Sequence, residues 1–131
     1  MRKVGIINPE VIKWISKVGH TDMILIADAG LPIPVNIPLI DLSFIEGQVP
    51  FMLVLKEILK ELLVENVIIA EETEKNSKEL FYEIEEEIKG YKKIICNHEE
   101  LKNISENVKV IIRTGEFTPY ANIILQAGVP F

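Results

Sequence analysis

The two histidines of the chain, His20 and His98, each lie beside a short apolar segment of the sequence. Asp28 closes the apolar run Met23–Ala27, at a position where a buried strand would ordinarily continue with another aliphatic residue. A histidine exchanges a proton near neutral pH, because its reference pKa is roughly 6.5, and a carboxylate can orient the imidazole or hold a ligand hydroxyl. These residue types predict acid–base chemistry on a small polar ligand.

Polar residues also follow the other apolar runs. Glu71 and Glu72 come directly after one run, His98 after another and Arg113 after a third. Ligands of open α/β sheets bind outside the carboxyl ends of the strands. We therefore expect these residues to gather there with Asp28, and His20 occupies the turn that leads into the same strand as Asp28.

Each candidate also has a purely structural interpretation. His20 follows Gly19 and could complement the dipole at a helix C-terminus. Asp28 could cap the turn at Gly30, and His98 could cap the helix that follows it. The sequence leaves both interpretations open for all three residues.

Several other polar features carry less information. Tyr120 and Asn122 flank a junction between a loop and a strand, where turn chemistry explains Asn and partial burial explains Tyr. The acidic run Glu83–Glu87 indicates a solvated helix face rather than a metal site. Gly115-Glu116 is too short to be a phosphate loop and no GxGxxG motif is present, so nucleotide cofactors gain no support and we expect neither metal nor cofactor.

The elements that must position these side chains alternate between helical and strand patterns. Asn8 looks like an N-cap with Pro9 at the first helical position, and Asn76 with Glu79 resembles a capping box. The expected helices run from Pro9 to near Gly19, from Pro50 through Leu62, from Asn76 through Ile88, and over Glu99–Asn107. The expected strands are Met23–Ala27, Leu39–Leu42, Val67–Ala70, Lys93–Cys96, Val108–Ile112 and Ala121–Ala127.

This alternation, with strands that are apolar on both faces, predicts helices on both sides of a largely parallel sheet, a three-layer α/β/α fold. The segment Lys93–Cys96 is expected to be one of the core strands. A chain of 131 residues fits a single domain, 1–131.

Charge and cysteine content narrow the function classes. With a formal net charge of −6 and lysines scattered among glutamates, the chain lacks the basic cluster that a nucleic-acid partner needs. Cys96 is the only cysteine, which rules out an intrachain disulfide and suits a reducing cytoplasm. The first apolar stretch is too short for a signal peptide and no run reaches membrane-spanning length, so no membrane association is expected.

The apolar content leaves the oligomeric state open. Hydrophobic residues make up 48% of the chain and its mean hydropathy is +0.23, so apolar surface could be covered by sister subunits or could simply fill a dense core. The segment Ile123–Phe131 stays apolar to its last residue. It could meet a partner surface, or it could insert as a strand in its own sheet with Phe131 folded inward.

Four segments together resemble the D-ribose pyranase family over nearly the full chain. They are Gly19-His20-Thr21-Asp22, Ala27–Pro34, Ile69–Glu72 and Arg113–Leu125. The sister L-fucose mutarotases share Gly-His-x-Asp and Tyr-x-Asn, but they typically carry Asp-Ala-His in place of Asp28-Ala29-Gly30 and Lys-Tyr-Gly-Asn in place of Pro119–Asn122. The ribose branch therefore fits better, and only the glutamate-rich stretch Glu74–Lys93 matches weakly.

The resemblance implies a cofactor-free cytoplasmic enzyme that interconverts the β-pyranose and β-furanose forms of D-ribose and supplies the furanose to ribokinase. It implies His20 as the proton donor, and sugar contacts from Asp28, His98, Tyr120, Ala121 and Asn122. It also implies a ring-like homo-oligomer, a decamer, and we expect the C-terminal part of one chain to close over the His20 and Asp28 of its neighbour. The alternatives are a non-catalytic sugar-binding or regulatory subunit and a mutarotase of another free sugar such as L-fucose.

Overall fold

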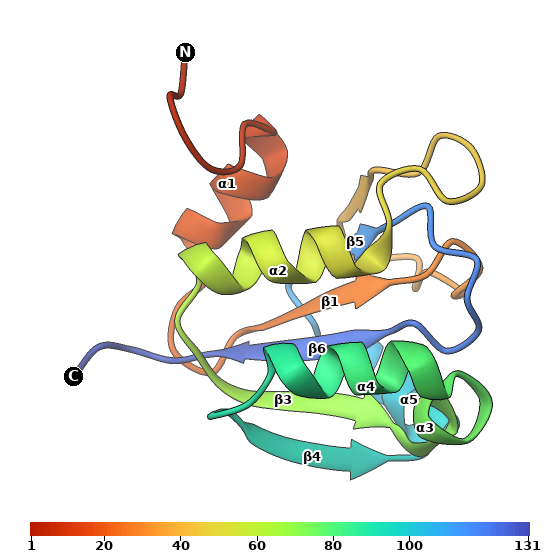
Figure 1. Cartoon of the computed structure of the whole chain (residues 1–131). Helices are drawn as coiled ribbons and strands as arrows, with labels where there is room; N and C mark the ends of the chain where they lie inside the picture. The colour runs from red at the N-terminus through yellow and green to blue at the C-terminus, as the bar shows by residue number, and fades with distance from the viewer.

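The centre of the computed structural model, which describes residues 1–131, is a six-stranded sheet in the order β2-β5-β1-β6-β3-β4 (Figure 1). The strands are β1 (Met23–Ala27), β2 (Leu39–Asp41), β3 (Val64–Ala70), β4 (Lys92–Cys96), β5 (Val110–Arg113) and β6 (Ile123–Ala127). The helices are α1 (Pro9–Lys17), α2 (Phe51–Glu61), α3 (Glu71–Asn76), α4 (Lys78–Glu87) and α5 (His98–Ser105).

Strand β6 alone runs against the other strands. It pairs antiparallel with both β1 and β3, whereas the β1–β5, β2–β5 and β3–β4 pairs are parallel. The connection from β5 to β6, residues 114–122, contains no helix. A parallel return needs a crossover of roughly a dozen or more residues, so a connection this short brings the chain back in the opposite direction. The sheet is largely parallel, as the sequence predicts.

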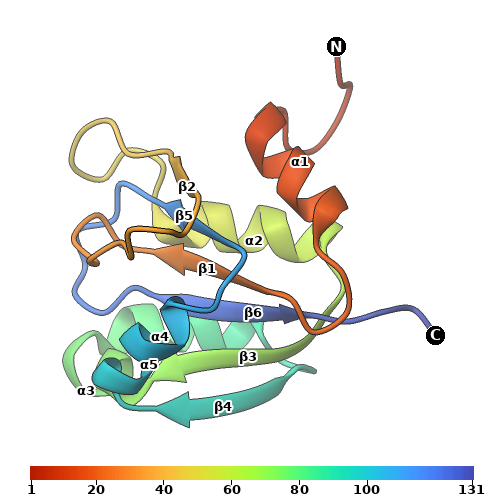
Figure 2. The same cartoon turned by 180° about the vertical axis from the view of Figure 1, so that it is seen from behind.

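Helices cover both faces of the sheet, which confirms the three-layer α/β/α fold. Figure 1 shows α2 and α4 in front of the sheet, and the reverse view in Figure 2 shows α5 on the other face. Each face of the sheet carries its own hydrophobic core, and successive β1 residues point into one core and then the other. Ile24 and Ile26 pack with α2 and α4, whereas Leu25 and Ala27 pack towards α5. The α2–α4 side holds the larger core, with 21 buried residues against 9.

Local signals in the sequence place most elements correctly. Asn8 caps α1, because its Oδ1 accepts hydrogen bonds from the Glu10 and Val11 backbone N–H groups at 3.0 and 3.1 Å. Strand β1 has the predicted bounds Met23–Ala27. Strand β3 begins at Val64, three residues before the predicted Val67. No helix in the structure has the length and apolar character needed to cross a membrane.

The expectation that Lys93–Cys96 forms a core strand is wrong. The corresponding strand β4 is the edge of the sheet, and its Ile94 and Ile95 side chains remain 37% and 46% exposed. An apolar run favours a strand, but burial depends on the position of that strand in the sheet, and β4 is paired on one side only.

The capping box predicted at Asn76 is also wrong. Asn76 ends α3, a helix that the sequence did not indicate, and its side-chain amide donates to the Glu72 carbonyl at 3.0 Å. Helix α4 begins at Lys78, and the side chain of its N-cap residue, Ser77, makes no capping hydrogen bond. The apolar positions predicted for α4, Phe81 and Ile84, are buried.

Gly115 generates a prediction about stability. A Cβ at this position would lie 1.8 Å from the Gln48 backbone oxygen, and Gly115 also exchanges backbone hydrogen bonds with Gly47 and Val49. Gly115→Ala must displace the 47–49 backbone, so we expect a loss of about 1–3 kcal/mol in the free energy of unfolding, measured by urea denaturation. In the control Gly19→Ala, the new Cβ has no neighbour nearer than 3.9 Å and stability should be unchanged or slightly raised. Equal stabilities of the two variants would contradict this account.

Candidate active site

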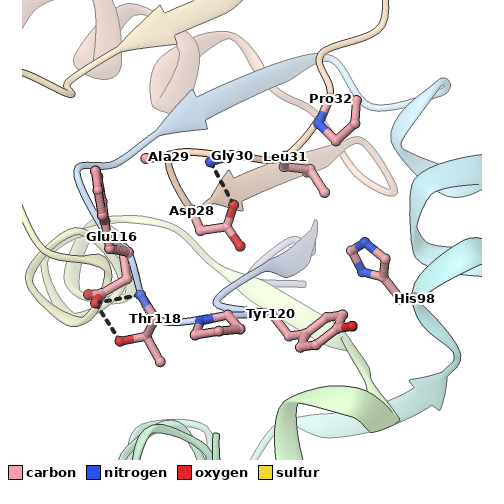
Figure 3. Close-up of a pocket in the computed structure, with 11 residues that line it drawn as sticks. Asp28, Ala29, Gly30, Leu31, Pro32, His98, Glu116, Thr118 and Tyr120 are labelled. Carbon is pink, nitrogen blue, oxygen red and sulfur yellow. Dashed lines mark hydrogen bonds between the residues drawn. The ribbon is translucent and has the colours of Figure 1, made fainter. Parts of the chain in front are cut away.

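A pocket of about 490 Å³ opens beyond the carboxyl ends of the parallel strands (Figure 3). This volume lies within the range of small-molecule sites, roughly 300–1,000 Å³. The pocket is lined by Asp28, Ala29, Gly30, Leu31 and Pro32 after β1, by His98 at the start of α5, and by Glu116, Phe117, Thr118, Pro119 and Tyr120 from the β5–β6 connection. Three stretches that are distant in the sequence therefore meet at this edge of the sheet.

Asp28 is fixed to the floor of the pocket by Asn122. The Asp28 backbone N–H donates to Asn122 Oδ1 at 2.9 Å, and Asn122 Nδ2 donates back to Asp28 Oδ2 at 3.2 Å. The other carboxylate oxygen, Oδ1, accepts from the Gly30 N–H at 3.0 Å. Asp28 therefore caps the turn at Gly30, as the structural interpretation held, and also presents a carboxylate to the pocket.

Burial changes the acidity of this carboxyl group. Desolvation raises the pKa of Asp28 above its usual value of 3.8, against the opposing effects of the hydrogen bonds from Gly30 and Asn122 and of the nearby His98. A carboxylate that is partly withdrawn from water accepts hydrogen bonds from ligand hydroxyls more readily than an exposed one. Raising the pKa of a carboxyl also brings that pKa closer to neutral pH, where a group can both take up and release a proton during a reaction.

His98 enters the pocket from the first residue of α5. The cap of that helix is Asn97, whose side chain accepts from the Glu100 N–H at 2.8 Å, so the capping interpretation of His98 is wrong. The His98 backbone N–H is held between the two Glu72 carboxylate oxygens at 3.0 and 3.1 Å. Its ring Nδ1 is buried and has no hydrogen-bond partner in the protein. The contact with Glu72 fixes the start of α5, from which the His98 imidazole reaches the lining of the pocket.

Tyr120 packs against His98 from the opposite wall. The two rings meet edge to face, with 5.0 Å between their centroids and an interplanar angle of 85°. In Figure 3 the Asp28 carboxyl, the His98 imidazole and the Tyr120 ring face a common space. This arrangement offers a charged acceptor, an imidazole and an amphipathic aromatic wall, which suits a small polyhydroxy ligand.

Glu116 anchors the loop that forms this wall. One of its carboxylate oxygens accepts from the Phe51 N–H at 3.1 Å, and the other accepts from the Thr118 hydroxyl at 2.8 Å. Helix α2 has Pro50 as its N-cap, with no side-chain cap, so Glu116 supplies a capping carboxylate from a distant part of the chain. No local sequence signal indicates this role, since Glu116 and Phe51 are 65 positions apart.

His20 does not lie in this pocket. It precedes β1, at the opposite end of the sheet from Asp28, and the five residues of β1 alone span about 17 Å. His20 Nε2 lies 3.1 Å from Glu65 Oε2, and about half of the His20 side chain is exposed. The expectation that His20 and Asp28 of one chain lie together in a site is therefore wrong. The two residues flank β1, and the two ends of a strand lie at opposite ends of the sheet.

The remaining candidates divide between the pocket floor and other sites. Ala121 and Asn122 are buried beneath the pocket and do not line it, so Asn122 holds Asp28 instead of forming an exposed wall. Arg113 forms an ion pair with Asp41 on the neighbouring β2, and this contact holds the pKa of Asp41 well below its usual range. Glu71 pairs with Lys75. No three His, Cys, Asp or Glu side chains cluster closely enough to hold a metal ion.

Fold and pocket together define a small α/β protein with a pocket at the carboxyl ends of its parallel strands whose lining suits a hydroxyl-rich ligand. The model of the RbsD / FucU transport protein family matches residues 1–130, so the chain belongs to this family.

Curated relatives match over the full length. Proteins named D-ribose pyranase from Clostridium perfringens, Clostridium tetani and Bacillus cytotoxicus are 54%, 51% and 45% identical to this chain over 131 residues, with both chains fully covered. The match with the first of these proteins extends over all 131 residues and therefore spans the segments that build the pocket.

Two solved structures share the fold and were determined with sugars. Bacillus subtilis RbsD complexed with D-ribose superposes with a TM-score of 0.96 at 44% identity, with full coverage of both chains. The fucose mutarotase of Streptococcus pneumoniae in complex with L-fucose gives a TM-score of 0.82 at 25% identity, with 95% of each chain covered.

The raised pKa of Asp28 predicts how sugar affinity depends on pH. Only the ionised carboxyl accepts hydrogen bonds through both oxygens, and this carboxyl takes up its proton at a higher pH than an exposed aspartate. We expect the Kd for D-ribose, measured by calorimetry, to rise as the pH falls through the raised pKa of Asp28 and to recover above it. The Asp28→Asn variant retains His98 but cannot ionise at position 28, so it should bind weakly and lack this pH step. Wild-type affinity that stays constant down to about pH 4 would contradict the assignment.

Proposed function

We propose that this protein is a sugar ring isomerase that interconverts the β-pyranose and β-furanose forms of D-ribose by acid–base catalysis, without a cofactor. The observation that carries the proposal is the pocket in which the Asp28 carboxylate and the His98 imidazole face one space beside Tyr120 (Figure 3). The full-length similarity to proteins named D-ribose pyranase supports ribose as the substrate, and ribokinase would then use the furanose product.

The chemistry needs only positioned acids and bases. The anomeric hydroxyl loses its proton, the bond between C1 and the ring oxygen breaks, and that oxygen takes up the electron pair and a proton to give the open aldehyde. A different hydroxyl then attacks C1 and loses its proton, while the aldehyde oxygen gains one. Each positioned acid or base typically contributes roughly 10²- to 10⁴-fold. Asp28 and His98 are placed to hold the sugar hydroxyls, while Asn122 keeps Asp28 in position.

We further propose that His20 donates the proton from a second copy of the chain. In one chain His20 lies at the opposite end of the sheet from the pocket, so a neighbour must bring it there. The sequence analysis expected the C-terminal part of one chain to close over both His20 and Asp28 of its neighbour. Because Asp28 and Tyr120 line one pocket of the same chain, only His20 would come from the neighbour.

Exposed apolar side chains support such a contact. Phe44 and Phe117 are exposed in the loops that follow β2 and β5 at the pocket end, and Leu63 and Phe131 are exposed towards the His20 end, before β3 and after β6. Two different surfaces on one chain favour head-to-tail association, which closes into rings when the rotation permits. A ring-like homo-oligomer, and the decamer implied by the resemblance, are part of this proposal, as is a cytoplasmic location, which the lone thiol of Cys96 suits.

Gly30 supports ribose over fucose. A Cβ at this position would meet nothing nearer than Asp28 Oδ1 at 3.9 Å, so Gly30 leaves the space beside the Asp28 carboxylate open. A side chain there, such as the His typical of fucose mutarotases, would stand next to the sugar-binding oxygen. We therefore expect a difference in sugar preference between the two branches at this position.

One observation favours a second candidate, a non-catalytic sugar-binding subunit. The pocket of a single chain contains Asp28, His98 and Tyr120, here called the sugar clamp, but lacks the proposed proton donor His20. Such a subunit would bind D-ribose without accelerating its ring interconversion, so a direct measurement of exchange separates the two functions.

The exchange measurement gives the first test. NMR magnetisation transfer should show faster pyranose–furanose exchange of D-ribose with the wild-type protein than without it, and slower exchange on L-fucose under the same conditions. His20→Ala should abolish the acceleration while the fold and ribose binding persist, because His20 is exposed and outside the core. A folded His20→Ala protein with undiminished exchange would remove His20 from the mechanism, and wild-type binding without exchange would favour the sugar-binding subunit.

Subunit mixing tests whether sites are shared. His20→Ala and Tyr120→Ala chains should each be inactive as pure oligomers. After joint dissociation and reassembly, some contacts would unite an intact His20 with an intact Tyr120 pocket, so we expect partial recovery of ring exchange. Mixing two batches of His20→Ala protein is the matched control and should recover nothing. Absence of recovery in mixed oligomers, verified by mass spectrometry, would show that each chain builds its site alone.

A further inference from the structure

The short helix α3 lies directly behind the pocket wall and contacts it through buried hydroxyl groups. Thr73, which is fully buried, donates from Oγ1 to the Tyr120 carbonyl oxygen at 2.8 Å. Ser77, at the junction of α3 and α4, donates from Oγ to the Pro119 carbonyl at 2.6 Å. Two consecutive carbonyls of the pocket loop are thus held by hydroxyls 42 to 47 positions away in the sequence.

Tyr120 needs such support because its backbone is strained. Its φ is +61°, in the left-handed region that non-glycine residues rarely adopt. Conformations of this kind persist only where the surrounding structure holds them. The Tyr120 carbonyl accepts from Thr73 and also from the Asn122 N–H at 3.0 Å, so these two bonds fix the peptide that follows the strained residue.

The residue before Thr73 holds the other ring of the pocket. Glu72 accepts the His98 backbone N–H with both carboxylate oxygens, and the His98 ring meets the Tyr120 ring edge to face. Consecutive residues of α3 therefore set the positions of both rings, one through a carboxylate and the other through a hydroxyl.

We propose that Thr73 and Ser77 are positioning residues for sugar binding, which hold Tyr120 in the left-handed conformation that places its ring against His98 and the ligand. Neither residue lines the pocket, so both act through the loop. This inference rests on the proposed function. A purely structural role, in which the hydroxyls only satisfy buried carbonyls, would affect stability without affecting affinity.

The test compares Thr73→Val, which keeps the shape of the side chain but removes the hydroxyl, with Thr73→Ser, which keeps the hydroxyl. We expect Thr73→Val to raise the Kd for D-ribose, measured by calorimetry, by about 3- to 10-fold, the loss that one ordinary hydrogen bond represents. In ring-exchange kinetics the loss should fall on KM more than on kcat. Thr73→Ser should recover most of the affinity.

Ser105→Ala is the matched control. Ser105 is equally buried and its Oγ donates to the Lys102 carbonyl, but it lies at the far end of α5 and outside the pocket. This variant should lose some thermal stability and keep the wild-type Kd. If Thr73→Val fails to fold, Ser77→Ala provides the same test at the neighbouring carbonyl, with a smaller expected rise in Kd.

A double-mutant cycle with Tyr120→Ala links the effect to the ring. Once the ring is gone, Thr73→Val should raise the Kd little further, because the group that it positions is absent. Equal ribose affinities of Thr73→Val and Thr73→Ser, or additive effects with Tyr120→Ala, would overturn the inference while leaving the proposed function intact. A wild-type protein that neither binds ribose nor exchanges its ring forms would overturn both.

Discussion

The short connection between β5 and β6 is the constraint on which the rest of the structure depends. Because residues 114–122 cannot cross back to the other end of the sheet, β6 enters between β1 and β3 in the opposite direction. The connection therefore stays at the carboxyl edge of the sheet, beside the residues that follow β1. This reversal brings Asn122 within hydrogen-bonding distance of Asp28 and makes the loop a wall of the pocket.

The same reversal sends the end of β6 to the edge where His20 lies. There the Thr21 N–H donates to the Ala127 carbonyl at 2.9 Å, and Thr21 adopts a φ of +71°. Of the two alternatives for the segment Ile123–Phe131, insertion as a strand holds for Ile123–Ala127, which form β6, but Phe131 is exposed and not folded inward. Two strained residues thus stand beside the functional candidates, Thr21 next to His20 and Tyr120 in the pocket, and strain of about 1–3 kcal/mol at each is sustained by neighbouring hydrogen bonds.

The separation of the sugar clamp from His20 gives assembly a chemical meaning in the proposed function. Asp28, His98 and Tyr120 line the pocket of a single chain, while the His20 imidazole, to which the proposal assigns proton donation, is half exposed beside Glu65. Asn122 and Thr73, which position Asp28 and Tyr120, are buried and hydrogen-bonded, whereas His20 lies on the surface. In the proposed function, this separation makes the activity depend on the quaternary state, because each site would be complete only when a neighbouring chain supplies His20.

The sequence by itself determined most of the helices and strands and which polar residues follow the strands that lead to the pocket. Apolar runs and the Asn8 cap are local signals, and polar residues directly after strands, such as Asp28 and His98, are placed by the rule that parallel strands end at one edge. Only the tertiary structure decided that β4 is an exposed edge, that α3 supports the pocket through Thr73, and that His20 lies at the far end of the sheet. These outcomes depend on strand order and on hydrogen bonds between residues far apart in the sequence, which no local pattern of residue types encodes.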